Sequence, residues 1–125
     1  MPHLILDGAV DLQRAIEALP GEARRWRTAV LKTTGVWISA DAGALLVEGV
    51  VVEHSRPLHP VAHVTVADGQ TKIRLWDVVP VERTPAVQRW LAELGRDLQA
   101  AGSVTLRTNN LAAGIIDDFD LDAAT

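Results

Sequence analysis

The sequence predicts a single domain of mostly β or α+β class, built on an antiparallel sheet. Runs rich in Val, Ile, Thr and Trp follow one another with short links, which favours antiparallel pairing of neighbouring strands. Asp68-Gly69 separates two alternating runs, and this dipeptide between such runs is the strongest short-range signal of a β-hairpin. One long helical pattern follows at 85–101. The 125 residues can bury a core, and the absence of cysteine excludes disulfides and thiolate sites.

The first part of the chain predicts a short helix and then two strands. Apolar residues recur at helical spacing over 12–19, after Asp7 or Asp11 as the N-cap and before a Pro20-Gly21 stop. The two strands each contain a glycine at which a bend or bulge is expected: 26–38 with Gly35, and 44–53 with Gly49. A polar link, HSRPLHP, leads into the hairpin.

The hairpin is the most informative segment, because its turn fixes the register of the two arms. Folding at Asp68-Gly69 pairs 61–66 with 71–76, and the side chains then alternate between two faces. One face is apolar and is expected to belong to the core: Ala62, Val64, Ile73 and Leu75. The other face is basic, polar and aromatic: His63, Thr65, Lys72, Arg74 and Trp76. This second face is the strongest functional candidate in the sequence.

The last part of the chain predicts a long amphipathic helix and a strand. Thr84 is a good N-cap, Pro85 suits the first helical position, and Gly102 supplies the stop. An alternating strand is expected over 103–108, and residues 111–121 either hold a last short strand or remain irregular.

From residue 45 to about 110 this order resembles an OB-fold, a Greek-key barrel with a helix between its third and fourth strands. The matching segments are the first strand, the hairpin, the helix and the fourth strand: 48–54, 61–77, 85–101 and 101–108. Bacterial single-stranded-DNA-binding proteins and anticodon-binding OB domains show a similar strand ending in Trp, then a helix, a Gly and a strand. The resemblance leaves 1–40 as a helix-strand extension and 111–125 as an acidic C-terminal segment.

The resemblance implies a non-enzymatic module that binds single-stranded nucleic acid. Trp76 would stack on a base, with Trp37 as the second candidate aromatic, while Lys72 and Arg74 would contact phosphates. The ARRWR run would add an auxiliary contact, or would merely be solvated charge at a turn. The expected contact residues are His63, Thr65, Lys72, Arg74, Trp76, Arg25, Trp26 and Arg27. Alternatively, the hairpin face is simply solvated, or is covered by the N-terminal helix.

A second hypothesis is a protein-interaction module, homodimeric, chaperone-like or immunity-like, that uses the exposed sheet face. A cluster of Glu53, His54, His59 and His63 matches no metal-ligand spacing and is better explained as a solvated link. The single H-x-T triplet at 63–65 lacks the second copy that phosphoesterases with this motif use, and no serine lies in a nucleophile elbow. We therefore predict neither an enzyme nor a cofactor.

The net charge of −4 argues against a general electrostatic attraction to phosphate backbones. Four of the 16 acidic residues lie in the C-terminal segment, and the remaining 12 match the 12 basic ones, so a locally basic face is compatible with the composition. The segment carries Asp117, Asp118, Asp120 and Asp122, and resembles the acidic tip by which single-strand-binding proteins recruit partners. No stretch reaches the roughly 18 apolar residues of a membrane helix, and no signal peptide is evident, so a cytoplasmic location is expected by default.

Overall fold

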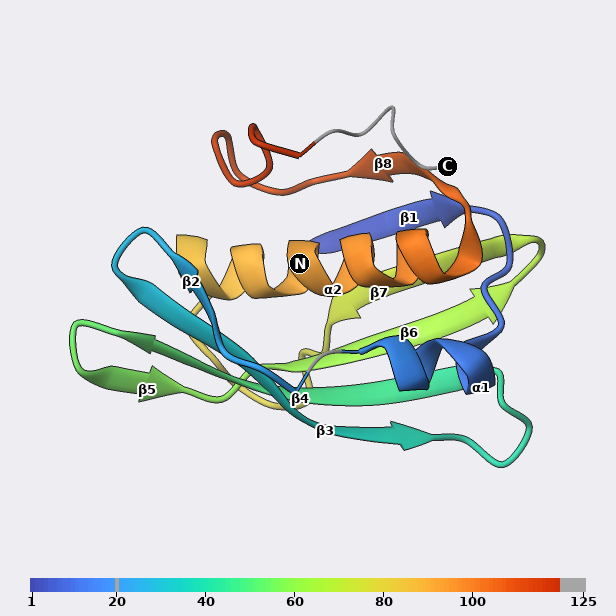
Figure 1. The fold of residues 1–125 in the computed structure, drawn as a ribbon, viewed down its shortest axis with the longest axis horizontal. Helices are drawn as coiled ribbons and strands as arrows, with labels where there is room; N and C mark the ends of the chain where they lie inside the picture. Colours follow the sequence, from blue (N-terminus) through green and yellow to red (C-terminus); the bar gives the residue numbers. More distant parts are fainter. Residues whose placement is uncertain (20, 120–125) are drawn as a thin grey trace.

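Eight strands form one antiparallel sheet that curls around a long helix, in a computed structural model that describes residues 1–19 and 21–119 (Figure 1). The elements in chain order are β1 (His3–Asp7), α1 (Leu12–Ala15), the 3-10 helix η1 (Ile16–Ala18), β2 (Arg24–Trp26), β3 (Ala29–Ile38), β4 (Ala44–Glu53), β5 (Arg56–Leu58), β6 (Val61–Ala67), β7 (Gln70–Leu75), α2 (Pro85–Gly102) and β8 (Thr105–Asn109). The antiparallel, mostly β class predicted from the sequence is confirmed.

The strand order is β2-β3-β4-β6-β7-β1-β8, and β5 pairs with β4. In the expected Greek key, the fourth barrel strand returns beside the first. These two strands correspond to β8 and β4, so β8 would lie next to β4. Instead β8 pairs with β1, and β1 occupies the free edge of β7. The Greek-key order is therefore not confirmed, because residues 3–7 form a strand that the sequence analysis did not predict.

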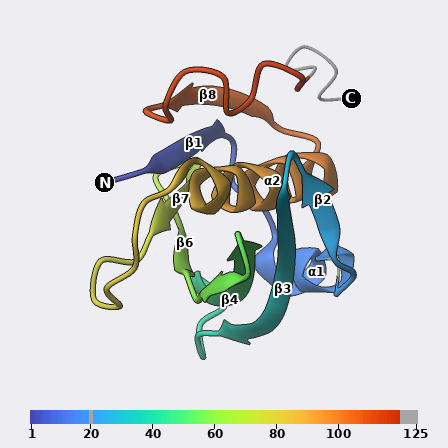
Figure 2. The same ribbon diagram turned by 90° about the vertical axis from the view of Figure 1, so that its left-hand side faces the viewer.

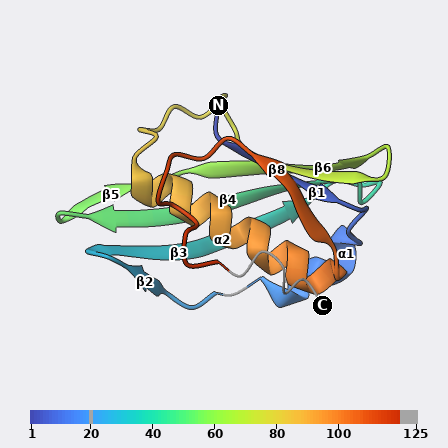
Figure 3. The same cartoon turned by 90° about the horizontal axis from the view of Figure 1, so that it is seen from above.

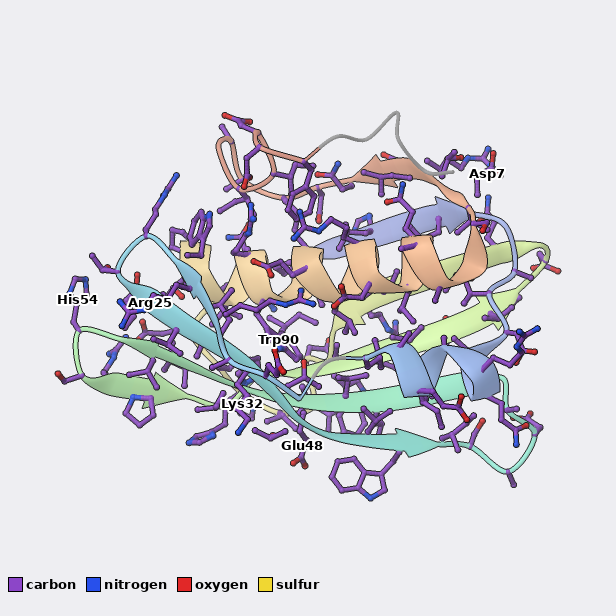
Figure 4. The ribbon with its side chains drawn as sticks, viewed as in Figure 1. Asp7, Arg25, Lys32, Glu48, His54 and Trp90 are labelled. Atoms are coloured by element: carbon purple, nitrogen blue, oxygen red, sulfur yellow. The ribbon has the colours of Figure 1, made fainter. Side chains whose placement is uncertain are left out.

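Helix α2 lies in the hollow of the curled sheet, as the end-on view in Figure 2 shows. Its apolar side is buried, including Val87, Leu91 and Leu98, which have no exposed surface. Burial of each such side chain contributes about 1.5–3 kcal/mol. Trp90 points from α2 towards the sheet and is 3% exposed (Figure 4). The helix begins at the predicted cap, where Thr84 Oγ1 accepts a 3.2 Å hydrogen bond from Val87 N.

The β6–β7 hairpin has the predicted register, from Val66 opposite Thr71 to Ala62 opposite Leu75. The pairing extends one step further, since Trp76 N donates to Val61 O at 2.7 Å. Asp68 and Gly69 have φ values of 53° and 74°, the positive values that a type I′ turn needs. All four predicted core residues of the hairpin are buried. Because the turn fixes the pairing, both faces of the hairpin follow from the sequence.

The remaining N-terminal elements follow the sequence in outline and differ in detail. Asp11 caps α1, while Pro20 of the expected stop lies outside the described residues. The strand predicted over 26–38 is split by a tight turn at Arg27, so β2 and β3 form a hairpin. The register of β3 shifts between Thr33 and Gly35, which is the bend expected at that glycine. The polar link contains β5, which folds back on β4.

The C-terminal segment crosses over α2 without forming a strand between residue 110 and residue 119 (Figure 3). It is held by Arg89 of α2, whose Nη1 donates to Ile115 O at 2.8 Å and whose Nη2 donates to Asp118 Oδ2 at 3.0 Å. The guanidinium of Arg89 also lies 4.4 Å from the Phe119 ring centroid. Asp118 thus binds within the chain, whereas Asp120 and Asp122 of the expected partner-recruiting tip lie outside the described residues.

Candidate functional site

The candidate site lies on the side of the sheet turned away from α2, which we call the outer face. The N-terminal helix does not cover it, because Leu12 and Ala15 of α1 pack into the core on the α2 side. Lys32 and Glu48 project from the outer face, opposite to Trp90 (Figure 4). The alternative in which the helix shields the hairpin is therefore wrong.

Strand register assembles a row of side chains across five strands of the outer face. Trp37 of β3 pairs with Leu46 of β4, and Leu46 pairs with His63 of β6. His63 then pairs with Arg74 of β7, and Arg74 pairs with His3 of β1. A parallel row places Ala44, Thr65, Lys72, Ile5 and Thr108 side by side. Aromatic, polar and basic groups from distant parts of the chain therefore lie together.

A shallow apolar hollow of about 340 Å³ occupies one end of this face. Its walls include Trp37, Leu46, His63 and Trp76. The His63 and Trp76 rings are tilted by 42°, with their centroids 6.3 Å apart. Trp37 is 55% exposed, which is unusual for so large an apolar side chain unless it contacts a partner. The hollow therefore offers flat aromatic surface to a ligand.

Gly35 determines where the Trp37 indole lies. A β-carbon at Gly35 would come within 2.6 Å of ring atoms Cη2 and Cζ3 of Trp37. The six-membered ring thus fills the space that any other side chain would need. Because the two residues lie on the same face, two positions apart, the glycine lets the indole lie close to the backbone.

Arg74 and His63 form a polar pair at the centre of the row. Arg74 Nε and Nη2 lie 3.3 Å and 3.0 Å from His63 Nδ1. Burial lowers the pKa of His63, and the positive charge of Arg74 lowers this pKa further. The neutral imidazole therefore predominates at pH 7, and it holds the guanidinium in place without neutralising the positive charge.

A second hollow, of about 320 Å³, lies on the other side of Arg74. It is lined by Met1, His3, Ile5, Lys72, Arg74 and Asn110. Asn110 fixes the start of the chain, since its Oδ1 accepts from His3 N and its Nδ2 donates to Met1 O, both at 2.7 Å. This hollow is basic, and we call it the basic hollow; the first is the apolar hollow.

Four neighbouring strands of the outer face carry a net positive charge although the whole chain is acidic. The outward positions of β3, β4, β6 and β7 carry three cations and one carboxylate: Lys32, Lys72, Arg74 and Glu48. Across residues 1–19 and 21–119, none of the three cations forms an ion pair. Such cations can bind an anionic ligand without first breaking an ion pair with a carboxylate of the protein.

The five hairpin residues of the predicted site lie together on the outer face, but the ARRWR residues do not join them. Arg25 is exposed opposite Val30, at the β2 edge of the sheet (Figure 4). Strands β3 and β4 separate it from the hairpin. Trp26 packs against the core, and the guanidinium carbon of Arg27 lies 4.2 Å from the centroid of its ring. Arg25 thus lies two strands away from the hairpin and Trp26 faces the core, so the ARRWR cluster does not extend the hairpin surface.

The sequence analysis named Trp37 as a candidate stacking residue, but it missed that other strands bring Trp37, Leu46, His3 and Asn110 to the hairpin. Alternation along 29–38 and 44–53 could have placed Trp37 and Leu46 on one face, but not next to His63. His3 and Asn110 gave no local signal, since their position depends on β1 pairing with both β7 and β8.

In the described part of the chain, no three His, Asp or Glu side chains converge to hold a metal ion. No helix among the described residues is long and apolar enough to span a bilayer. The chain matches no family of known proteins, and neither a curated protein nor a solved structure is significantly similar to it. The fold and site thus define an α+β domain with one partly aromatic, partly basic sheet face.

Proposed function

We propose that this protein is a non-enzymatic module that binds single-stranded nucleic acid on the outer face of its sheet. The observation that carries the proposal is the adjacency of the apolar and basic hollows, with Arg74 lining one and its partner His63 lining the other. Unpaired bases need a flat aromatic surface, and the phosphates that follow them need cations within a few ångströms.

The two hollows can divide these roles. Trp37 and Trp76 supply the aromatic surface for a base, and each base stacked on such a ring contributes about 1–3 kcal/mol. Lys72 and Arg74 supply the charges for phosphate, and they have no ion-pair partner in the ranges 1–19 and 21–119. Thr65 stands beside Lys72 and adds a hydroxyl that can donate or accept.

The test is a titration of the tryptophan fluorescence with an unstructured oligonucleotide at several salt concentrations. We expect quenching, and an affinity that falls as salt rises, because binding releases counterions from the phosphates. Lys72→Gln should reduce the slope of log affinity against log salt by about 0.7, the value for one phosphate contact on a single strand. Arg14→Gln removes one exposed charge from α1 and should leave the slope unchanged. No quenching in the wild-type protein would refute the proposal.

A second candidate, a homodimer formed through the same face, is favoured by one specific observation. Trp37 and Ile38 are 55% and 37% exposed and adjoin the apolar hollow. Light scattering gives the mass in solution. Two results together would favour this candidate: the protein is a dimer that Trp37→Ala dissociates, and it binds no oligonucleotide. Self-association, and not nucleic-acid binding, would then be the function of the outer face.

A further inference from the structure

The bond between Arg74 and His63 fixes which ring nitrogen of the histidine carries the proton. A guanidinium has hydrogen-bond donors and no acceptor, so Nδ1 of His63 must accept from Arg74. A neutral imidazole has one donor and one acceptor nitrogen. The proton of neutral His63 therefore lies on Nε2.

The polar groups of the apolar hollow are mostly donors. In the part of the chain that is described, His63 Nε2 and the indole nitrogens of Trp37 and Trp76 form no hydrogen bond with the protein, and all three carry a hydrogen. Ser39 also lines the hollow, but its hydroxyl donates to Asp41 at 2.7 Å and accepts from Ala44 N at 3.0 Å. Among the described residues no buried side-chain nitrogen or oxygen lacks a partner, so these N–H groups are accessible to a ligand, whereas the Ser39 hydroxyl is already engaged.

We infer that His63 is the specificity-determining residue of the outer face, where its Nε2–H selects a base with keto acceptors, uracil or thymine, over cytosine. The inference rests on the proposed function. Uracil and thymine carry a carbonyl oxygen at C4, where cytosine carries an amino group, which is a donor; the C2 carbonyl is common to all three, so the selection is made at C4. A donor facing Nε2–H leaves both groups without a partner, and an unpaired polar group in an apolar site is unfavourable.

Arg74 has a positioning role in this selection. It holds Nδ1 as the acceptor and so keeps the proton on Nε2, in addition to its own contact with phosphate. Without Arg74, either ring nitrogen can carry the proton, and the edge that faces the base can accept as well as donate.

The experiment compares oligothymidylate with oligocytidylate, each of about 12 nucleotides, within the site size of one small domain. Wild-type protein should bind oligothymidylate roughly two- to tenfold more tightly, the effect of one hydrogen bond. His63→Phe keeps an aromatic ring but has no N–H, so both oligonucleotides should bind equally. His63→Gln retains a side-chain donor and should keep part of the preference. Arg14→Gln, remote from the outer face, is the matched control and should keep all of it.

A second measurement needs no nucleic acid. The ring ¹⁵N shifts of His63 in the free protein distinguish a protonated from an unprotonated nitrogen, and we expect the proton on Nε2. In Arg74→Gln the share of the tautomer that carries its proton on Nδ1 should rise, because the donor that holds Nδ1 as an acceptor is gone.

The outcomes separate the two proposals. Binding of neither oligonucleotide refutes the proposed function and this inference together. Equal binding of both by the wild type, or a preference that survives His63→Phe, refutes the inference and leaves the proposed function standing. A proton on Nδ1 in the free protein also refutes the inference.

Discussion

Gly35 of β3 and Gly49 of β4 face opposite sides of the sheet. Replacing each by alanine is therefore expected to have different effects on the stability of the protein. A β-carbon on Gly49 would lie 2.5 Å from Nε1 and 2.6 Å from Cζ2 of Trp90, which is 3% exposed. A β-carbon on Gly35 would meet the Trp37 ring at 2.6 Å, but this indole is 55% exposed and can move into solvent. Neither glycine has a positive φ, so alanine fits the backbone at both sites.

The size of each stability effect depends on whether the neighbouring tryptophan ring can move away from the new β-carbon. Overpacking a core costs about 1–3 kcal/mol. Displacing the indole of Trp90 also weakens its 3.3 Å hydrogen bond to Thr33 Oγ1, which contributes about 1 kcal/mol. Replacing glycine by alanine in a strand by itself raises the free energy of unfolding by about 0.5–1 kcal/mol, because the unfolded chain loses conformational freedom. We therefore expect Gly49→Ala to lower the free energy of unfolding by about 1–3 kcal/mol, and Gly35→Ala to leave it unchanged or raise it by about 0.5 kcal/mol.

Urea unfolding followed by far-UV circular dichroism measures both free energies. Gly35→Ala should also weaken oligonucleotide binding, because the indole of Trp37 loses its place over the backbone. Equal stability of the Gly49→Ala variant and the wild type would show that Trp90 is not packed against β4 as described. A Gly35→Ala variant destabilised as much as Gly49→Ala would refute the assignment of the two glycines to opposite faces.

Three further predictions concern charged groups. Arg89→Met removes the 2.8 Å hydrogen bond to the buried Glu93 and the bonds to Ile115 O and Asp118, while Glu93 keeps Arg24 as a partner at 3.0 Å. The free energy of unfolding in urea should therefore fall by about 1.5–3 kcal/mol, the effect of losing hydrogen bonds to a charged group. Arg89 lowers the pKa of Asp118. Attachment of the C-terminal segment should therefore be complete above the ordinary aspartate pKa and weaken as pH falls through the lowered one, seen as faster hydrogen exchange at the Ile115 amide. The lowered pKa of His63 stabilises the fold above the ordinary histidine value of 6.5, and this stability is lost as pH falls through the folded pKa; His63→Phe should remove this part of the pH dependence.

Local rules were sufficient wherever neighbours in sequence are also neighbours in space. The Asp68-Gly69 turn gave the hairpin register and both of its faces, and Thr84 gave the start of α2. The expected barrel order failed because strand pairing between distant segments is not encoded locally. The sequence period shows which side chains share a face, but it does not show which strand lies alongside.

The fate of Arg89 illustrates the same limit. In a helical pattern it belongs to the polar side of α2, and a solvated position would be expected. In the structure Arg89 is only 4% exposed. Trp26 of β2 and the C-terminal segment cover that side of the helix. The C-terminal segment also supplies two hydrogen-bond partners, Ile115 O and Asp118. A residue's burial depends on what packs over it, which a one-dimensional pattern cannot specify.

The sequence alone thus determined the antiparallel class, the central hairpin and the outward position of Lys72, Arg74 and Trp76, because a short turn and a period of two fix these features. The tertiary structure alone decided that Trp37 and His3 complete the surface, because β3 and β1 reach the hairpin through pairings across long stretches of chain. Such pairings are chosen by the packing of the whole sheet around α2, and no local segment contains that information.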